Sequence, residues 1–242
     1  MDGVTSAPDE AAVAARLAAL VAQYGLPPGA GARLRRLLDL VQESHHSLTA
    51  VRDPVAGVEV HIADSLAGLS VEAIQSAKLI ADLGSGAGFP GLVLALARPE
   101  ARVVLVESVG KKAGFLADAA EELRLENVEV VGGRAEAWEA GLGACDVVTA
   151  RALARLDVLL EYAAPLLRGE GALVAWKGKR DKGEETAAWK AGKILGMEAP
   201  VPRIVPGPDG SERHLYLSRK LRSTPAGYPR RPGMAAKRPL GG

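Results

Sequence analysis

The sequence predicts an α/β fold in which a doubly wound, mostly parallel, seven-stranded sheet follows an N-terminal helical extension. Two observations carry this prediction. Residues 9–74 show only helical periodicity, whereas short, fully apolar runs alternate with helical patterns from residue 78 onward. Fully apolar strands that alternate with helices are typical of a parallel sheet covered on both faces.

The N-terminal extension is predicted to contain three helices, over residues 9–24, 32–49 and 58–74. Apolar residues recur at helical spacing in each segment, and proline-containing stretches separate them. Binding a cofactor to the sheet does not require this extension. We therefore expect residues 1–76 to form a lid or a substrate platform.

The alternating part of the chain supplies the predicted sheet. The strands are predicted at residues 79–83, 102–107, 128–131, 146–150, 172–176, 201–205 and 214–217. The helices are predicted at residues 90–97, 111–125, 135–140, 154–167 and 184–195. Residues 77–220 form this domain, and residues 221–242 form a basic, Pro/Gly-rich tail. Ligands of such sheets bind beyond the carboxyl ends of the strands.

A glycine-rich turn follows the first predicted strand and marks the expected ligand site. Gly84, Gly86, Gly88 and Gly91 stand within eight residues, directly after the apolar run that ends in Asp82 and Leu83. A phosphate-binding P-loop would require Lys and Ser/Thr after the last glycine, where Leu92 and Val93 stand. A dinucleotide turn would require a small residue where Phe89 stands. Both kinds of site are disfavoured.

The remaining arrangement resembles the S-adenosylmethionine site of the Rossmann-like class I methyltransferases. Asp82 lies two residues before Gly84, and Glu107 ends the second apolar strand, 23 residues after that glycine. Asp82 offers an acceptor to the methionine ammonium, directly or through water, and Glu107 offers acceptors to both ribose hydroxyls. Glycines admit the methionine group against bare backbone.

Residues after the other strand ends complete the expected cofactor site. An apolar residue after the second strand can lie on the adenine, and an acceptor after the third can read its amino group. A guanidinium after the fourth strand suits a carboxylate or a phosphate and is the candidate positioning residue. These residues are Ser108, Val109, Ala135, Glu136 and Arg151.

Composition narrows the class of protein. The chain has 242 residues and a single cysteine, Cys145, so it has neither a disulfide framework nor a cysteine-based zinc site. The four histidines show no metal-ligand spacing, and we expect no metal. No signal peptide or membrane-spanning run is evident, which predicts a soluble, cytoplasmic protein.

Charge is concentrated at the C-terminal end. Residues 219–242 carry seven basic and no acidic residues, so the chain before them holds 23 basic and 29 acidic residues. Two interpretations of the tail stand beside simple solvation. It either binds a polyanion, RNA first, or folds back over the mouth of the cofactor site.

The residues after the fourth strand bear on the methyl acceptor. The segment Thr149-Ala150-Arg151-Ala152 differs from the Asn/Asp-Pro-Pro-Tyr/Phe loop that usually serves exocyclic amines, and Cys145 precedes the strand instead of following it. A purine N7 carries no proton, so positioning alone serves it. The site is compatible with N7 methylation.

The whole chain resembles the bacterial 16S ribosomal RNA guanine-N7 methyltransferase G family, also called glucose-inhibited division protein B. The segments that carry the resemblance are Ser47-Leu-Thr49, His61-Ile-Ala-Asp64-Ser65, Asp82 to Gly91, Glu107 to Lys112, Ala150-Arg-Ala152, Lys177-Gly178, Arg213-His214, Tyr228 to Gly233 and Lys237 to Leu240. Ser47 replaces the usual Asn, and Glu107 stands where many members have Asp.

The resemblance implies cytoplasmic methylation, with S-adenosyl-L-methionine, of one guanine in the decoding-centre loop of 16S ribosomal RNA, within the small ribosomal subunit. The resemblance also implies a cofactor contact at Phe89, and we expect the protein to be a monomer. The expected RNA contacts are Lys111, Lys112, Lys177, Lys179, Arg213, His214, Arg230, Arg231 and Lys237. Two alternatives stay open, namely a small-molecule methyltransferase and a non-catalytic RNA-binding protein on the same fold.

Overall fold

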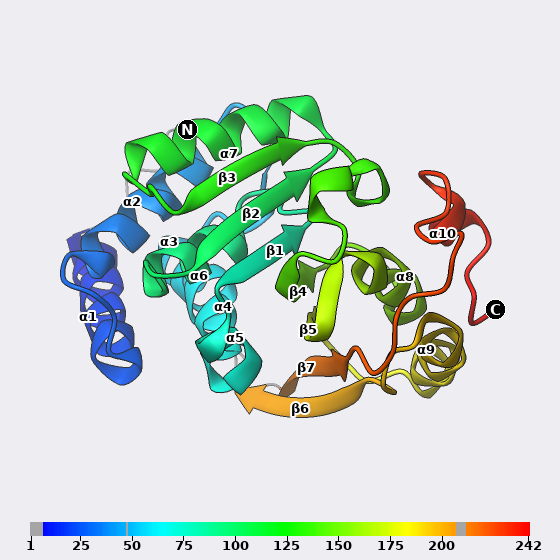
Figure 1. The fold of residues 1–242 in the computed structure, drawn as a ribbon. Helices are drawn as coiled ribbons and strands as arrows, with labels where there is room; N and C mark the ends of the chain where they lie inside the picture. Colours follow the sequence, from blue (N-terminus) through cyan, green and yellow to red (C-terminus); the bar gives the residue numbers. More distant parts are fainter. Residues whose placement is uncertain (1–6, 47, 207–211) are drawn as a thin grey trace.

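A computed structural model describes residues 7–46, 48–206 and 212–242, and a seven-stranded sheet lies at its centre (Figure 1). The strands are β1 (Leu79–Leu83), β2 (Arg102–Glu107), β3 (Val128–Gly132), β4 (Cys145–Arg151), β5 (Leu167–Lys177), β6 (Val201–Pro206) and β7 (Glu212–Arg219). They lie in the order β3-β2-β1-β4-β5-β7-β6. Strand β7 pairs antiparallel with both β5 and β6, and all the other neighbouring pairs are parallel. The predicted fold class is confirmed.

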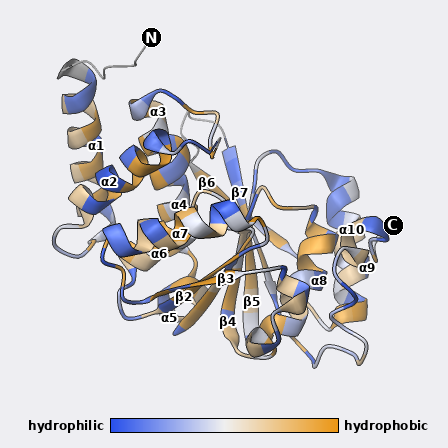
Figure 2. Ribbon diagram, turned by 90° about the horizontal axis from the view of Figure 1, so that it is seen from above, coloured by the Kyte–Doolittle hydropathy of each residue, from blue (hydrophilic) through white to orange (hydrophobic). Residues whose placement is uncertain are grey.

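Two helix layers enclose the sheet. One layer contains α1 (Ala7–Tyr24), α2 (Ala30–Glu43), α3 (Pro54–Gly57), α4 (Asp64–Leu66), α5 (Glu72–Ser76), α6 (Gly91–Ala97) and α7 (Gly110–Glu122). The other contains α8 (Leu156–Leu166), α9 (Lys182–Leu195) and α10 (Met234–Lys237). Figure 2 shows the hydrophobic strands between these two layers. No helix in the described ranges is both long and apolar enough to cross a membrane.

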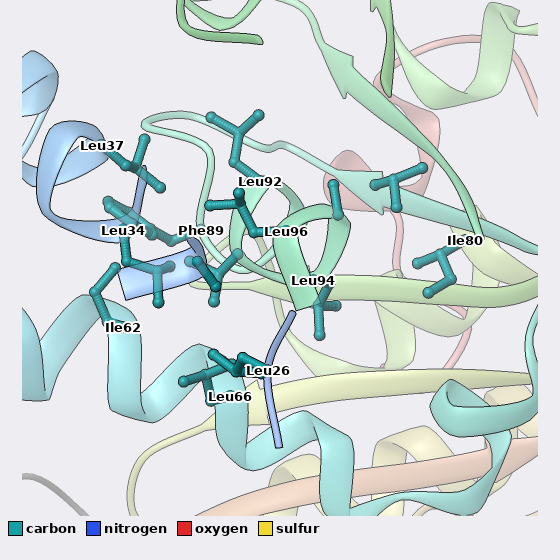
Figure 3. Packing of buried hydrophobic residues seen from close by; sticks show 14 of the residues in the cluster. Leu26, Leu34, Leu37, Ile62, Leu66, Ile80, Phe89, Leu92, Leu94 and Leu96 are labelled. Carbon is teal, nitrogen blue, oxygen red and sulfur yellow. The ribbon is translucent and has the colours of Figure 1, made fainter. Parts of the chain in front are cut away.

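Alternating strand residues divide the interior into two cores. Ile80 of β1 belongs to the core under the N-terminal helices, whereas Ala81 and Leu83 belong to the core under α8 and α9. Successive strand side chains point to opposite faces, so the same five-residue strand serves both cores. Figure 3 shows Leu34 and Leu37 of α2 beside Leu92 and the other α6 leucines. The N-terminal helices are therefore one layer of the fold, and the predicted boundary at residue 76 falls between α5 and β1.

The second predicted helix is too long. It ends at Glu43 because Ser44 adopts an extended conformation, with ψ of 128°, and its hydroxyl accepts a hydrogen bond from the His46 amide. Such local hydroxyl-to-backbone bonds compete with helix continuation. The family-like segment that follows begins at Ser47, which lies outside the described residues.

The third predicted helix is interrupted by non-α turns. A π-helical turn, Val58–Ala63, lies between α3 and α4, and a 3₁₀ turn, Ala67–Ser70, precedes α5. Tertiary contacts account for part of this irregularity. A Cβ at Gly68 would lie 2.5 Å from the Trp176 ring, so the turn and the β5 tryptophan approach each other closely. π-Helical turns often occur at functional sites.

The segment after β3 is also corrected. Residues 135–140 were expected to form a helix, but they form two 3₁₀ turns, Ala135–Ala137 and Glu139–Gly141. The Trp138 ring packs directly over Gly141, where a Cβ would lie 2.3 Å away. That packing folds the short segment back on itself.

Candidate cofactor and substrate site

The loop between β1 and α6 keeps its backbone accessible at one glycine in particular. Gly84, Gly86 and Gly88 all have positive φ angles, of 64°, 57° and 90°. A Cβ at Gly86 would meet nothing closer than the Gly84 carbonyl oxygen at 3.7 Å, whereas a Cβ at Gly88 would lie 2.3 Å from Leu92. Gly86 therefore leaves room beside the loop, while Gly88 lets α6 pack.

Glu107 ends β2 and holds the glycine loop. Its carboxylate is 5% exposed; Oε2 accepts a hydrogen bond from the Gly86 amide at 2.9 Å, and Oε1 accepts one from the Val109 amide at 2.8 Å. Each carboxylate oxygen has a further lone pair. The side chain can therefore accept from two neighbouring hydroxyls, which is the arrangement that a ribose presents.

Asp82 lies beneath the loop. It is 1% exposed, and its oxygens accept hydrogen bonds from the Thr149 hydroxyl at 2.8 Å and the Gly91 amide at 3.2 Å. Burial raises the pKa of Asp82 to about 6, although the hydrogen bonds from Thr149 and the loop oppose the rise. The expected direct contact with a ligand ammonium does not fit this burial. Asp82 instead anchors the start of α6 to β1 and β4.

A narrow pocket of about 60 Å³ lies beside the loop. It is lined by Leu83, Gly84, Val106, Ser108, Gly133, Arg134, Ala135, Glu136, Leu153 and Tyr162. The structure thus brings together Ser108, Ala135 and Glu136, three of the residues expected in the cofactor site, whereas Val109, the residue expected to lie on the adenine, is 41% exposed and outside this lining. Leu153 lies directly over Gly84, where a Cβ would be 2.6 Å from it.

Arg151, at the end of β4, joins the sheet to the N-terminal helices. Its Nη1 donates hydrogen bonds to the Val60 carbonyl oxygen and to Asp64 Oδ2, both at 2.9 Å. The guanidinium carbon lies 5.4 Å from the centroid of the Phe89 ring. Arg151 therefore links the helical extension, the glycine loop and β4 at one point.

His61 lies in the same cluster, on the π-helical turn. Its ring stacks on Phe89, with 4.6 Å between centroids and an interplanar angle of 6°. Its Nε2 is 2.9 Å from the Thr49 hydroxyl. Burial, with the nearby charge of Arg151, lowers the pKa of His61 to about 4. The imidazole is thus neutral at pH 7 and orders this cluster.

A second, wider cavity adjoins Arg151, and we call it the basic cleft. It has a volume of about 340 Å³ and is lined by Val60, Asp64, Arg151, Ala152, Trp176, Lys177, Gly178 and Arg213. These residues come from the N-terminal helices and from the ends of β4, β5 and β7. The indole Nε1 of Trp176 donates to the Asp64 carbonyl oxygen at 2.7 Å and fixes the two walls together.

Most of the residues expected to contact RNA are partly or fully exposed. Lys111 and Lys112 lie in the first turn of α7, Lys179 follows β5, and Arg231 and Lys237 lie in the tail. Lys177 lies in the basic cleft, where its ammonium pairs with Glu184 at 2.6 Å.

Two of the residues expected to contact RNA, His214 and Arg230, are instead engaged within the protein. His214 is 4% exposed, and its Nδ1 is 2.8 Å from the Gly178 carbonyl oxygen, so it does not reach the surface. Arg230 forms a bidentate ion pair with Glu161, at 2.6 and 2.5 Å. The Glu161 side chain is only 3% exposed, so Arg230 is committed to folding the tail.

The tail folds back toward the narrow pocket beside the glycine loop, as one of the two interpretations of the tail expected. The Gly233 amide donates to Glu136 Oε1 at 2.8 Å, and Ala235 is 1% exposed against the core under α8. A Cβ at Gly241 would lie 2.2 Å from the Ala187 carbonyl oxygen, so the end of the chain lies against α9. One carboxylate of the expected cofactor site is therefore held by the tail.

Several residues of the site were not singled out from the sequence. Leu153 and Tyr162 line the narrow pocket, and Asp64 and Trp176 line the basic cleft. Leu153 closely follows the strand end that holds Arg151, and this position could have identified it. Asp64 stands in one of the segments that carry the family resemblance, but no local signal places it beside Trp176, because only the packing of α4 on β5 makes them neighbours.

The fold and the site together define a class I methyltransferase dependent on S-adenosylmethionine. The open face of Gly86, the free lone pairs of Glu107 and the pocket that combines apolar side chains with Glu136 fit the methionine, ribose and adenine of that cofactor in turn. A solved O-methyltransferase, TomG from Streptomyces achromogenes in complex with S-adenosylmethionine, shares the fold, with a TM-score of 0.53 and 19% identity over 78% of this chain and 90% of that one.

Sequence comparison identifies the family. The family model described as rRNA small subunit methyltransferase G matches residues 32–215. Curated proteins named ribosomal RNA small subunit methyltransferase G are 43% identical in Rubrobacter xylanophilus, over 81% of this chain and 78% of that protein, and 42% identical in Chloroflexus aggregans, over 86% and 90%. The chain belongs to the rRNA small subunit methyltransferase G family. The predicted family, enzyme class and methyl donor are confirmed.

Proposed function

We propose that this chain methylates N7 of one guanine in the decoding-centre loop of 16S ribosomal RNA. We further propose that it acts on the assembled small subunit, as a monomer in the cytoplasm. The observation that carries the proposal is the basic cleft, which is lined by Arg151, Lys177 and Arg213. It lies beside the glycine loop between β1 and α6, in a chain that belongs to this family. Of these three, Arg213 has no ion-pair partner among the described residues, and an unpaired guanidinium is suited to a phosphate-rich substrate.

The cofactor end of the site is proposed to act through the glycine loop and its neighbours. Gly84 and Gly86 would face the methionine group, Glu107 would accept from the ribose hydroxyls, and Glu136 would accept from the adenine amine. Phe89 and Arg151 would close the loop from the side of the N-terminal helices. Asp82 would hold the loop from beneath.

N7 is the proposed methyl acceptor because its methylation does not require a general base. When bound, S-adenosylmethionine supplies an electrophilic methyl group on a positively charged sulfur. A purine N7 has an in-plane lone pair and no proton, so the protein needs to position it and does not need to deprotonate it. His61 is neutral and bonded to Thr49, and Cys145 is buried at the far end of β4, where burial raises the pKa of its thiol to about 12. Neither side chain is placed to act as a base or as a nucleophile.

The N-terminal helices are proposed to form the substrate platform. Asp64 and the Val60 carbonyl hold Arg151, and His61 holds Phe89, so these helices shape the wall of the cleft where the base would enter. The exposed cations Lys111, Lys179, Arg231 and Lys237, with the partly exposed Lys112, would contact the RNA backbone around that entrance.

Product analysis tests this proposal. The protein is incubated with S-adenosylmethionine and either assembled small subunits or naked 16S ribosomal RNA. The RNA is then digested to nucleosides, which are separated and identified by mass spectrometry. We expect 7-methylguanosine, formed faster on small subunits than on naked RNA. A methylated product at another atom, or methylation of small molecules alone, would contradict the proposal. RNA binding without any transfer would favour the non-catalytic alternative.

A further inference from the structure

The basic cleft contains an acceptor that the described part of the chain does not use. Asp64 Oδ2 accepts from Arg151 at 2.9 Å, and the Asp64 main chain is fixed by Trp176. Its second oxygen, Oδ1, has no hydrogen-bond partner among the described residues, although the side chain is only 12% exposed. A carboxylate oxygen in this position is an acceptor for a donor group of the ligand.

The same cleft contains an unused donor. Arg151 is paired with Asp64, and Lys177 is paired with Glu184 and donates to the Ala154 carbonyl oxygen at 3.2 Å. Arg213 makes no hydrogen bond or ion pair with any described residue, and its Nε is fully buried without a partner. The Arg213 side chain lines the cleft, so its unpaired guanidinium is available to an acceptor group of a ligand.

An acceptor and a donor in one cleft match the Watson–Crick edge of guanine. That edge presents N1–H and N2–H₂ as donors next to O6 as an acceptor, whereas adenine presents an acceptor at N1 and a donor at N6. A carboxylate would therefore accept from guanine but face a lone pair on adenine. The edge lies away from N7, so a base held in this way keeps N7 free, and enzymes that act on an extruded base commonly read this edge.

Building on the proposed function, we propose that Asp64 selects guanine by accepting hydrogen bonds from N1–H and N2–H₂, with Arg213 donating to O6. Arg151 is the positioning residue that holds the Asp64 carboxylate at the cleft wall. The pair decides which base enters the cleft, and the cofactor loop decides which atom of that base receives the methyl group.

The test compares bases that differ by one group. Small subunits are reconstituted with 16S ribosomal RNA that carries guanine, inosine or 7-deazaguanine at the methylated position, and their affinity for protein loaded with S-adenosylhomocysteine is measured. Inosine lacks only the 2-amino group. We expect the wild-type protein to prefer guanine to inosine by roughly tenfold, the lower range for one lost base-edge interaction.

Matched variants assign this preference to the pair. Asp64→Asn keeps an oxygen for Arg151 but replaces the free acceptor, so the guanine-to-inosine ratio should fall to within twofold of one. Asp118→Asn, which removes an exposed charge on α7, should leave the ratio unchanged. Arg213→Gln should weaken guanine and inosine equally, because both bases have O6. Thermal unfolding and S-adenosylhomocysteine affinity are measured for every variant as controls for folding. If Asp64→Asn does not fold, the pair is still tested by Arg213→Gln and by the affinities of the wild-type protein for the three bases.

The outcomes separate the two proposals. If the wild-type protein does not discriminate inosine, or if folded Asp64→Asn keeps the full ratio, the guanine-reading pair is wrong even where 7-methylguanosine is formed. If subunits with 7-deazaguanine, which lacks N7, are still methylated at that base when S-adenosylmethionine replaces S-adenosylhomocysteine, the proposed acceptor atom is wrong even where the pair reads the base. If the subunits are neither bound nor methylated, both proposals fail.

Discussion

Gly86 is the residue at which we propose that the glycine loop presents its backbone to the methionine group of the cofactor. Its φ of 57° and the open space at its missing Cβ predict that Gly86→Val strains the loop and fills the methionine site. We expect S-adenosylmethionine binding to fall below detection in calorimetric titration. The far-UV circular dichroism spectrum should stay unchanged, because the valine side chain would point away from the core.

Gly143 provides a control for the strain alone. It has a φ of 65°, a Cβ added there would have nothing within 4 Å, and it lies before β4, at the opposite end of the sheet. Gly143→Val should cost comparable stability and leave cofactor affinity intact. Equal loss of binding in both variants would show that the effect of Gly86→Val is not local.

Asp82 and His61 predict opposite dependences of stability on pH. The pKa of Asp82 is raised to about 6, so its contribution to stability is lost as pH rises from 4 to 6. The pKa of His61 is lowered to about 4, so its contribution increases over the same range. Asp82→Asn should remove the first effect. The unfolding free energy of Asp82→Asn minus that of the wild type should increase by about 3 kcal/mol between pH 4 and 6.5. Urea denaturation at each pH measures both free energies. Parallel curves for the two proteins would contradict the assignment.

The C-terminal segment is predicted to act as an element that orders the cofactor site. Arg230→Ala would leave the buried Glu161 carboxylate unpaired, which costs about 3 to 5 kcal/mol of stability. It would also release Gly233 from Glu136, so S-adenosylmethionine affinity should fall. Urea denaturation and calorimetric titration measure the two effects.

Arg231→Ala is the matched control for this element, because its side chain is exposed beside Arg230. Its stability should change by no more than about 0.5 kcal/mol, and cofactor affinity should not change. Truncation after residue 222 should behave like Arg230→Ala. Normal cofactor affinity in the truncated protein would mean that the tail is not part of the site.

At the scale of the whole molecule, the charge distribution predicts how RNA binding responds to salt. The chain before residue 219 is net acidic, whereas Arg231 and Lys237 are exposed on the folded tail. The double variant Arg231→Gln with Lys237→Gln should bind small subunits with a slope of log affinity against log salt that is shallower by roughly 1.4 to 1.8, at 0.7 to 0.9 per lost phosphate contact.

The control removes two exposed charges at the other edge of the sheet. Lys78 precedes β1 and Arg124 precedes β3, so both lie at the amino ends of the strands, away from the proposed RNA face. Lys78→Gln with Arg124→Gln should leave the slope unchanged. If both double variants change it equally, RNA binding is a property of net charge and not of the tail.

The strands and the cofactor loop were predictable from sequence because their signals are local. Apolar runs such as 79–83 and 102–107 are buried on both faces, and the glycines with Glu107 stand at strand ends, where topology brings them together. The boundaries of the N-terminal helices were less predictable. Helix α2 ends where the Ser44 hydroxyl accepts a hydrogen bond from the His46 amide. The turn at Gly68 packs closely against the Trp176 ring.

Sequence alone therefore determined the fold class and the family, and it singled out the edge of the sheet where we propose that the cofactor binds, because period, spacing and motif all lie within short stretches of chain. Only the tertiary structure decided that Asp82 is buried under its loop, that Arg230 pairs with Glu161, and that Asp64 and Arg213 line the same cleft. Those roles depend on burial and on partners distant in sequence. A side chain's charge is visible in the sequence, but whether that charge is solvated, paired or free is set by the residues that pack around it.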